Sequence, residues 1–255
     1  MTHDLVVLAA GRGTRFGGLK QLAPVGPGDD AIVDHLLRRA SDVGFTHAVV
    51  VVRPDIVATM REHLGARRHG IPVDLAVQEP DPGGGLGGTA AAVLSCRNRV
   101  SGPFAVANAD DLYPADALAA LAGHLTRAPE HALVAFRLDR TLLGSRPVSR
   151  ALIETDDDRL TAITEATIDP TAADDRWVST NLWGFRPSVF GHLERAVSER
   201  RREADASATA HEEVLLPDVV AGMVASGEVI RVLRCESPCL GITYAEDLDA
   251  LRARQ

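Results

Sequence analysis

The sequence has no long apolar run, few cysteines and no targeting segment at its start. No apolar stretch approaches the roughly 18 residues of a membrane span, so we expect no membrane association. The N-terminus lacks the basic segment, apolar core and cleavage site of a secretion signal. The three cysteines, Cys96, Cys235 and Cys239, form no zinc-binding pattern. These absences together favour a protein of the reducing cytoplasm.

The sequence also has no excess of basic over acidic residues. The formal net charge is −8 and aromatic residues make up 4% of the chain, which argues against a nucleic-acid partner. The nine histidines show no H-E-x-x-H or H-x-H pattern, and we assign them no metal. A hydrophobic fraction of 45% in 255 residues is enough for a sizeable core.

The first half of the chain alternates short apolar runs with amphipathic stretches. The runs predict buried strands at 5–9, 48–52, 73–77, 103–107 and 132–136. The stretches between them predict helices at 31–43, 55–64, 87–95 and 114–125. This alternation predicts an α/β fold, a mostly parallel twisted sheet with helices on both faces. In such sheets ligands bind beyond the C-terminal ends of the strands.

After about residue 140 the pattern changes. Segments 151–154 and 160–164 flank an acidic turn and predict a hairpin, and 177–185 and 229–233 predict further strands. Helices are expected at 187–198, 215–226 and 245–254, while 198–211 is either a helix end or a loop. Because no linker or internal repeat interrupts the sequence, we expect a single domain over 1–255, with a β-rich second half over the core.

The most distinctive stretch follows the first predicted strand. Glycines at 11, 13, 17 and 18 are interspersed with Arg12, Thr14, Arg15 and Lys20. Glycines let backbone amides approach a ligand, and the cations add fixed positive charge, so the loop suits a triphosphate. The dinucleotide fingerprint fails because Phe16 replaces its third glycine, and the P-loop fails because Leu19-Lys20-Gln21 follows Gly18. The alternative is a plain turn with surface cations.

Three further groups of residues could contact a ligand. Gln78 ends a predicted strand before a glycine-rich stretch, where it could hydrogen-bond a base or simply belong to a connector. Asp110 and Asp111 follow another strand, where a carboxylate could hold Mg²⁺ or cap the next helix. Glu165 and Asn181 could bind hydroxyl groups or merely satisfy backbone groups.

The order A-G-x-G-T-R, then K-Q-L-x-P-V, resembles the nucleotidyltransferases that join a nucleoside triphosphate to a sugar 1-phosphate, of the glucose-1-phosphate thymidylyltransferase type. The resemblance implies a Rossmann-like, three-layer core of the glycosyltransferase-A type with a substrate-covering subregion. It implies a nucleotide-binding half at 1–140 and a sugar-phosphate-binding half at 141–255. Members of the family often self-associate, so a homo-oligomer is a further expectation.

The resemblance also implies roles for individual residues. Arg15 and Lys20 would be catalytic and Asp110 would hold Mg²⁺. Sugar contacts would come from Asn108, Glu165 and Asn181. The nucleotide would be bound by the loop and the base-binding segment, at Ala10, Gly11, Arg12, Gly13, Thr14, Gln78 and Gly87.

The chain departs from the family pattern at two positions. Ala166 stands where the family often has a lysine that grips the sugar phosphate, and Gly241 stands near the place of a second metal-binding aspartate. Asp247, Asp111 or Glu213 could replace that carboxylate. Two alternatives therefore stay open: a cytidylyl- or guanylyltransferase with a non-sugar phosphate acceptor, and a non-catalytic nucleotide-binding module. A dinucleotide-dependent oxidoreductase is least favoured.

Overall fold

The computed structural model describes residues 3–25, 30–80, 87–207 and 213–252. The glycines at 83–85, which the base-binding prediction included, lie outside these ranges. The strands are β1 (His3–Leu8), β2 (Phe45–Val52), β3 (Arg67–Arg68), β4 (Ile71–Val77), β5 (Phe104–Asn108), β6 (Asp111–Leu112), β7 (His131–Arg137), β8 (Val148–Asp156), β9 (Arg159–Ile168), β10 (Trp177–Phe185), β11 (Ile230–Cys235) and β12 (Leu240–Gly241). The α-helices are α1 (Ile32–Asp42), α2 (Val57–Leu64), α3 (Gly88–Leu94), α4 (Ala115–Arg127), α5 (Val189–Ser207), α6 (Leu216–Ala225) and α7 (Asp247–Arg252).

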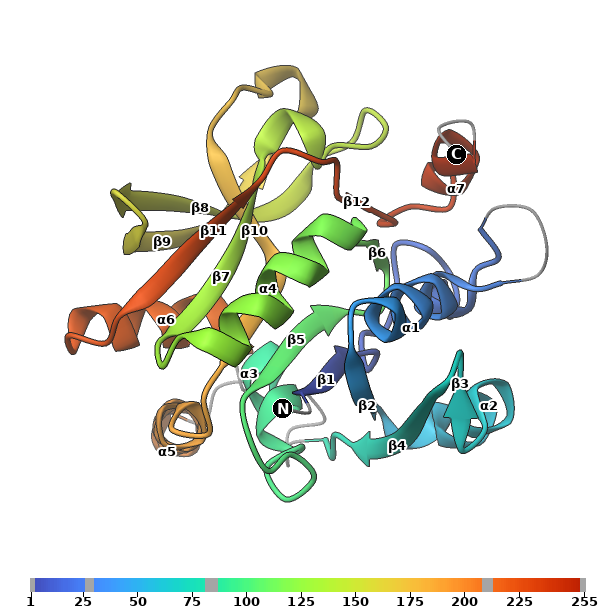
Figure 1. Cartoon of the computed structure of the whole chain (residues 1–255), viewed down its shortest axis with the longest axis horizontal. Coiled ribbons are helices and arrows are strands. Elements are labelled where there is room, and N and C mark those ends of the chain that lie inside the picture. Colours follow the sequence, from blue (N-terminus) through green and yellow to red (C-terminus); the bar gives the residue numbers. More distant parts are fainter. Residues whose placement is uncertain (1–2, 26–29, 81–86, 208–212, 253–255) are drawn as a thin grey trace.

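Ten of these strands form one sheet in the order β3-β4-β2-β1-β5-β10-β7-β11-β9-β8. The neighbouring strands β4, β2, β1 and β5 are parallel, as the alternating pattern predicts. Helices α1 and α4 lie over one face of the sheet, while α3, α5 and α6 lie over the other (Figure 1). The predicted three-layer α/β class is therefore confirmed.

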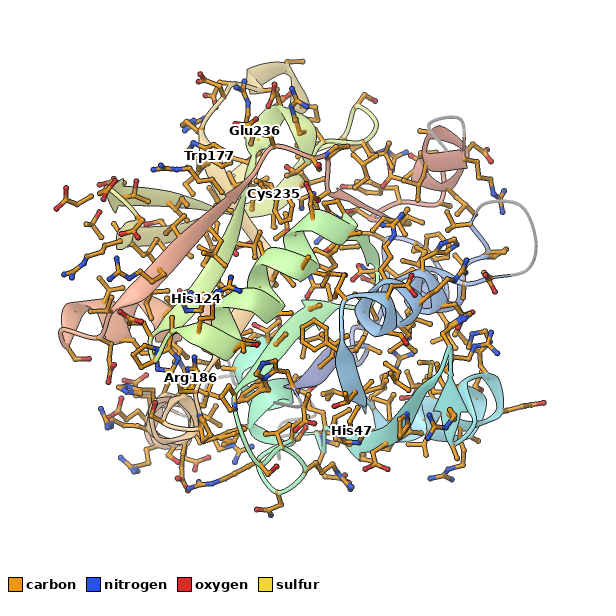
Figure 2. All side chains as sticks on the ribbon, viewed as in Figure 1. His47, His124, Trp177, Arg186, Cys235 and Glu236 are labelled. Atoms are coloured by element: carbon orange, nitrogen blue, oxygen red, sulfur yellow. The ribbon has the colours of Figure 1, made fainter. Side chains whose placement is uncertain are left out.

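The two faces of β1 show how the sequence produces these layers. Leu5 and Val7 belong to the apolar cluster beneath α1 and α4, whereas Val6 and Leu8 belong to the cluster beneath α3 and α5. A strand that is buried on both faces needs apolar residues at consecutive positions, since its side chains alternate between the faces. Figure 2 shows side chains filling the space between α4 and the strands.

The second half adds mainly antiparallel pairings. Strand β10 runs antiparallel between β5 and β7, and β8 and β9 form a long hairpin. This hairpin is longer than predicted, so Glu165 lies inside β9 and not after it. Helix α5 continues to Ser207, past the predicted end near 198, because its charged, alanine-rich last turns are compatible with an exposed helix.

One short strand pairing was not predicted from the sequence. Strand β12 runs antiparallel to β6, which brings the segment after Cys239 across the end of β5. The backbone amide of Ile242 donates to the carbonyl of Asp110 at 3.0 Å. Among the described residues, no helix has the length and apolar character needed to cross a membrane.

Candidate active site

The loop after β1 and the end of β5 meet at the same edge of the sheet. These two strands are parallel neighbours, so their C-terminal ends lie side by side. The Nζ atom of Lys20 forms an ion pair with the Asp110 carboxylate and lies 3.4 Å from the carbonyl oxygen of Ile242. Lys20 is also the only lysine of the sequence, whose other basic side chains are arginines and histidines. The structure therefore brings Lys20 and Asp110 together, as expected.

The glycine loop curls back on itself. Gly13 has a left-handed backbone with φ of 59°, and a Cβ at this position would overlap the carbonyl oxygen of Gly18. The carbonyl oxygen of Gly13 accepts hydrogen bonds from the amides of Phe16 at 3.0 Å and Gly17 at 2.9 Å. A side chain at position 13 would force this turn open, so the glycine is required by the geometry.

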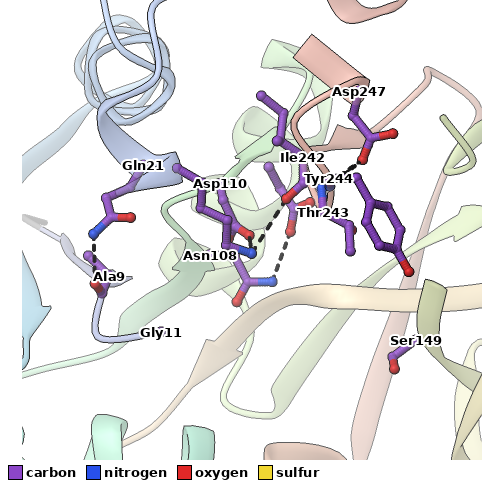
Figure 3. A network of polar contacts seen from close by, with 12 residues as sticks. Ala9, Gly11, Gln21, Asn108, Asp110, Ser149, Ile242, Thr243, Tyr244 and Asp247 are labelled. Carbon is purple, nitrogen blue, oxygen red and sulfur yellow. Dashed lines mark hydrogen bonds and ion pairs between the residues drawn. The ribbon is translucent and has the colours of Figure 1, made fainter. Parts of the chain in front are cut away.

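The neighbouring part of the loop presents unpaired donors. Gln21 is 3% exposed, and its Nε2 donates at 3.1 Å to the carbonyl of Ala9, which anchors the loop to the end of β1 (Figure 3). Within the described ranges, the amides of Gly11 and Thr14 donate to no protein atom, and the guanidinium of Arg15 has no hydrogen-bond or ion-pair partner. Such groups suit an anionic ligand.

A cleft of about 400 Å³ opens in front of these loops. It brings together most of the predicted site residues, from both halves of the chain: Gly11, Gly13, Thr14, Arg15, Lys20, Asn108, Asp110, Glu165 and Asn181. An adjoining recess of about 360 Å³ is lined by the predicted residues Ala10, Arg12 and Gln78. Gly11, Gly13 and Thr14 line both hollows, so the two lie side by side. Gly87 lines neither, although its neighbour Gly88 lines the recess.

Gln78 is held at the floor of the recess. It is 4% exposed, and its Nε2 donates at 3.0 Å to the carbonyl of Gly88, at the start of α3. Gly88 has φ of 79°, and a Cβ there would overlap the backbone of Val214. Gln78 therefore holds the first residue of α3, which in turn packs closely against the backbone of Val214, just before α6.

A buried polar network lies behind Asp110. Asn108 Nδ2 donates at 2.8 Å to Asp111, and the hydroxyl of Tyr113 lies 3.2 Å from the same carboxylate oxygen. Burial and the negative charge of Asp110 raise the pKa of Asp111 to about 6, against the lowering influence of Arg150, Asn108 and Lys20. Two adjacent carboxylates of this kind repel each other unless a cation lies near them.

Position 241, where the family pattern has an aspartate, lies beside the carboxylate of Asp111. Asp111 and Gly241 are direct partners in the β6–β12 pairing, and a Cβ on residue 241 would overlap Oδ1 of Asp111. Asp247, another candidate replacement, instead accepts the backbone amides of Thr243 at 2.9 Å and Tyr244 at 2.8 Å. Glu213 lines both hollows and is exposed. Of the three candidates, Asp111 is therefore the one whose carboxylate lies directly beside position 241.

The far wall of the cleft comes from the second half of the chain. Glu165 and Asn181, the predicted sugar contacts, line it together with Ser149 and Arg150, whose place in the cleft no sequence motif indicates. Asn181 has φ of 62° and its Oδ1 accepts the indole N–H of Trp183 at 3.1 Å. Burial raises the pKa of Glu165, and the positive charge of Arg150 opposes that shift.

A glycine loop, a lysine and paired carboxylates at the C-terminal edge of a parallel sheet form a site suited to phosphate groups. Residues 5–214 match the family model of the MobA-like NTP transferase domain, so the chain belongs to this family and is a nucleotidyltransferase. No curated protein sequence matches the chain.

Solved structures share the fold over nearly the whole chain. A putative glucose-1-phosphate thymidylyltransferase from Bacillus anthracis, in complex with sucrose, matches with a TM-score of 0.74 and 16% identity, covering 99% of this chain and 95% of that one. The inositol-1-phosphate CTP transferase from T. maritima matches with 0.67 and 17%, covering 99% and 96%. A UDP-glucose pyrophosphorylase complexed with UDP-glucose matches with 0.73 and 14%, covering 100% and 98%. At these identities the likeness establishes the fold.

Proposed function

We propose that this protein transfers a nucleotidyl group from a nucleoside triphosphate to a sugar 1-phosphate and releases pyrophosphate. The observation that carries the proposal is the Lys20–Asp110 ion pair. The pair lines the cleft together with Glu165 and Asn181, and the recess lined by Gln78 adjoins that cleft. A cation and a carboxylate at this point can act on the phosphates of a nucleotide while the two flanking walls hold the base and the acceptor.

The two hollows have the size and lining for such a pair of substrates. Volumes of about 400 and about 360 Å³ lie within the usual range for small-molecule sites. Leu8, Ala10 and Ala92 give the recess an apolar surface, which suits a base, and Gln78 adds an amide. The cleft has mainly polar and charged side chains, which suit phosphates and hydroxyl groups.

The reaction requires little proton transfer from the protein. A phosphate monoester has a second pKa of about 6, so the acceptor is already mostly a dianion at neutral pH. One of its oxygens attacks the α-phosphorus in line, a new P–O bond forms, and the bond to the bridging oxygen of the β-phosphate breaks. The electron pair of that bond leaves with pyrophosphate. The protein must therefore align two anions and offset their repulsion.

The residues of the glycine loop would offset the repulsion between the two anionic substrates. Lys20 would contact the α-phosphate and the incoming phosphate, while Arg15 would hold the β- and γ-phosphates and the departing pyrophosphate. The amides of Gly11 and Thr14 would donate to further phosphate oxygens. Arginine suits the outer phosphates because its planar fork binds two oxygens, whereas the compact lysine suits a crowded reaction centre.

Asp110 and Asp111 fit a divalent cation, which we propose to be Mg²⁺. Their carboxylates stand next to each other in the cleft, and the burial that raises the pKa of Asp111 is a cost that a bound cation would offset. Mg²⁺ prefers one or two carboxylates together with phosphate oxygens and water. When bound, it would neutralise charge on the phosphates and the leaving group.

A screen of nucleoside triphosphates against phosphate acceptors, with pyrophosphate release as the readout, tests the proposal. We expect release with at least one sugar 1-phosphate. The likeness to an inositol-1-phosphate CTP transferase makes cytidylyl or guanylyl transfer to a non-sugar acceptor the second candidate, and inositol 1-phosphate in the same screen separates the two. Thermal stabilisation by a triphosphate without any pyrophosphate release would instead indicate a non-catalytic module.

A further inference from the structure

Arg150 carries a positive charge on the wall of the cleft opposite the glycine loop. It lies on β8, is half-buried and lines the cleft. Its Nη2 donates at 2.7 Å to the carbonyl of Thr141, its Nε lies 3.2 Å from the Thr141 hydroxyl, and its Nη1 donates at 2.8 Å to the carbonyl of Ser149. The guanidinium is thus fixed in position by uncharged acceptors.

Arg150 also lacks a direct counter-ion. No carboxylate of the described residues lies within ion-pair distance of it, whereas Arg68 is paired with Asp34 and Arg231 with Asp158. Arg150 nevertheless lines the same cleft as the carboxylates of Asp111 and Glu165. A fixed guanidinium without a salt-bridge partner in a cleft is suited to bind an anion.

The position of Arg150 in the hairpin is informative. It is the direct partner of Ala166 in the β8–β9 pairing, so the two side chains share one face of the hairpin. Alanine at 166 leaves this face without a second cation and gives the long arginine side chain room. The positive charge that the far wall lacks at position 166 is thus present on the adjacent strand.

We propose that Arg150 binds the phosphate of the acceptor. The inference rests on the proposed function, in which two anionic reactants must lie in one cleft. Lys20 and Arg15 belong to the loop at one side, next to the recess that would hold the base. Arg150 and Glu165 leave opposite faces of the hairpin but both line the cleft, so an acceptor bound there would turn its hydroxyl groups toward Glu165 and its phosphate toward the guanidinium.

Two variants separate a charge role from a structural one. Arg150→Gln keeps a hydrogen-bond donor but removes the charge, and Arg150→Lys keeps the charge but loses the planar fork. Arg159→Gln, an exposed position of the same hairpin, is the matched control. We expect Arg150→Gln to raise the KM for the acceptor about ten- to a hundredfold, the range for one charged hydrogen bond, with the KM for the triphosphate nearly unchanged. Lysine should recover part of the loss, and the control should match the parent.

The same proteins are tested for binding by calorimetry with glucose 1-phosphate, inositol 1-phosphate and dTTP as probes. Loss of monoester binding in Arg150→Gln, with partial recovery in Arg150→Lys, supports the inference even if the parent releases no pyrophosphate, in which case only the proposed function fails. An active parent whose Arg150→Gln variant keeps the acceptor KM overturns the inference alone. Equal losses for acceptor and triphosphate, or a parent that binds neither monoester, also overturn it.

Discussion

The ammonium of Lys20 and the carboxylate of Asp110 join two loops that are far apart in the sequence. Their side chains are 24% and 19% exposed, so the pair stands in the cleft and can be reached by a ligand. One loop follows β1 and carries the glycines, and the other ends β5 and carries the paired aspartates. Substrate phosphates would meet both partners of this pair at once, which makes each a direct test of the proposed mechanism.

Lys20→Ala should lower turnover by about 10²–10³, the loss typical of removing one preorganised charged donor. Because no other lysine exists, an amine-acylating reagent can modify only Lys20 and the N-terminus. We expect mass spectrometry to show that a bound triphosphate protects Lys20 but not the N-terminus. Lys20→Arg keeps the charge and serves as the control for simple electrostatics. Turnover at the parent rate in Lys20→Ala would refute the assigned role.

Asp110→Asn should weaken the dependence of activity on Mg²⁺, because a neutral amide is a poorer ligand than a carboxylate. Mn²⁺ binding, followed by electron paramagnetic resonance without substrate, gives a readout separate from turnover, and we expect at least a tenfold weaker affinity. Asp156→Asn removes an exposed carboxylate from the same molecule and should bind Mn²⁺ as the parent does. An unchanged metal titration in Asp110→Asn would remove this residue from the metal site.

Much of the core could be predicted because its signals are local. A buried strand needs a run of apolar residues, as at 48–52, and such runs predicted the parallel strands and the sheet edge that carries the proposed site. The glycine loop could also be predicted from the sequence, because Gly13 stands where only a glycine allows the turn. The hairpin of β8 and β9 was placed correctly but too short, because partly exposed strands show a weaker pattern.

The remaining parts of the site depend on pairings between distant segments. Nothing near Asp111 in the sequence indicates that Gly241 lies opposite it, and nothing near Arg150 indicates that it faces the cleft. Set against the family pattern, the sequence therefore shows only a missing aspartate at position 241 and a missing lysine at position 166. In the fold, each of those positions is paired with a residue that carries a charge of the missing sign, Asp111 and Arg150 respectively.

Gly241→Ala should displace the Asp111 carboxylate, because a Cβ there would overlap it. The move breaks the hydrogen bond from Asn108, so we expect a loss of about 1–3 kcal/mol in the free energy of unfolding together with weaker Mn²⁺ binding. Gly102→Ala, at a glycine with open space around its Cβ, is the control. An alanine variant with parent stability and metal affinity would show that the contact is unimportant.

An exchange of the two residues tests whether the carboxylate can come from either strand. Asp111→Gly should lose metal affinity, and the double variant Asp111→Gly/Gly241→Asp should regain part of it, because the partners face each other across the β6–β12 pairing. Mn²⁺ binding is again the measurement. A double variant no better than Asp111→Gly would show that position 241 cannot present a carboxylate to the site.

His131 should make the protein sensitive to mild acid. The residue is 3% exposed, and its Nδ1 accepts the amide of Arg186 at 3.2 Å, so the neutral ring is the form that fits. Burial lowers its pKa from 6.5 to about 4, and the positive charges of His192, Arg186 and His124 add to the effect, whereas Glu228 opposes it. His124 and Arg186 are labelled in Figure 2.

The sign of the effect follows from the two states of His131. Below pH 6.5 the unfolded chain gains a proton on His131 that the folded chain does not take up until about pH 4. Stability therefore falls as the pH decreases through this window, by up to about 3 kcal/mol at 1.36 kcal/mol per pKa unit. Urea unfolding of the parent and of His131→Asn at pH 7, 5.5 and 4.5 should show a weaker pH dependence in the variant, whose amide stays neutral throughout. An imidazole that titrates near pH 6.5 in the folded protein, followed by NMR, would contradict this account.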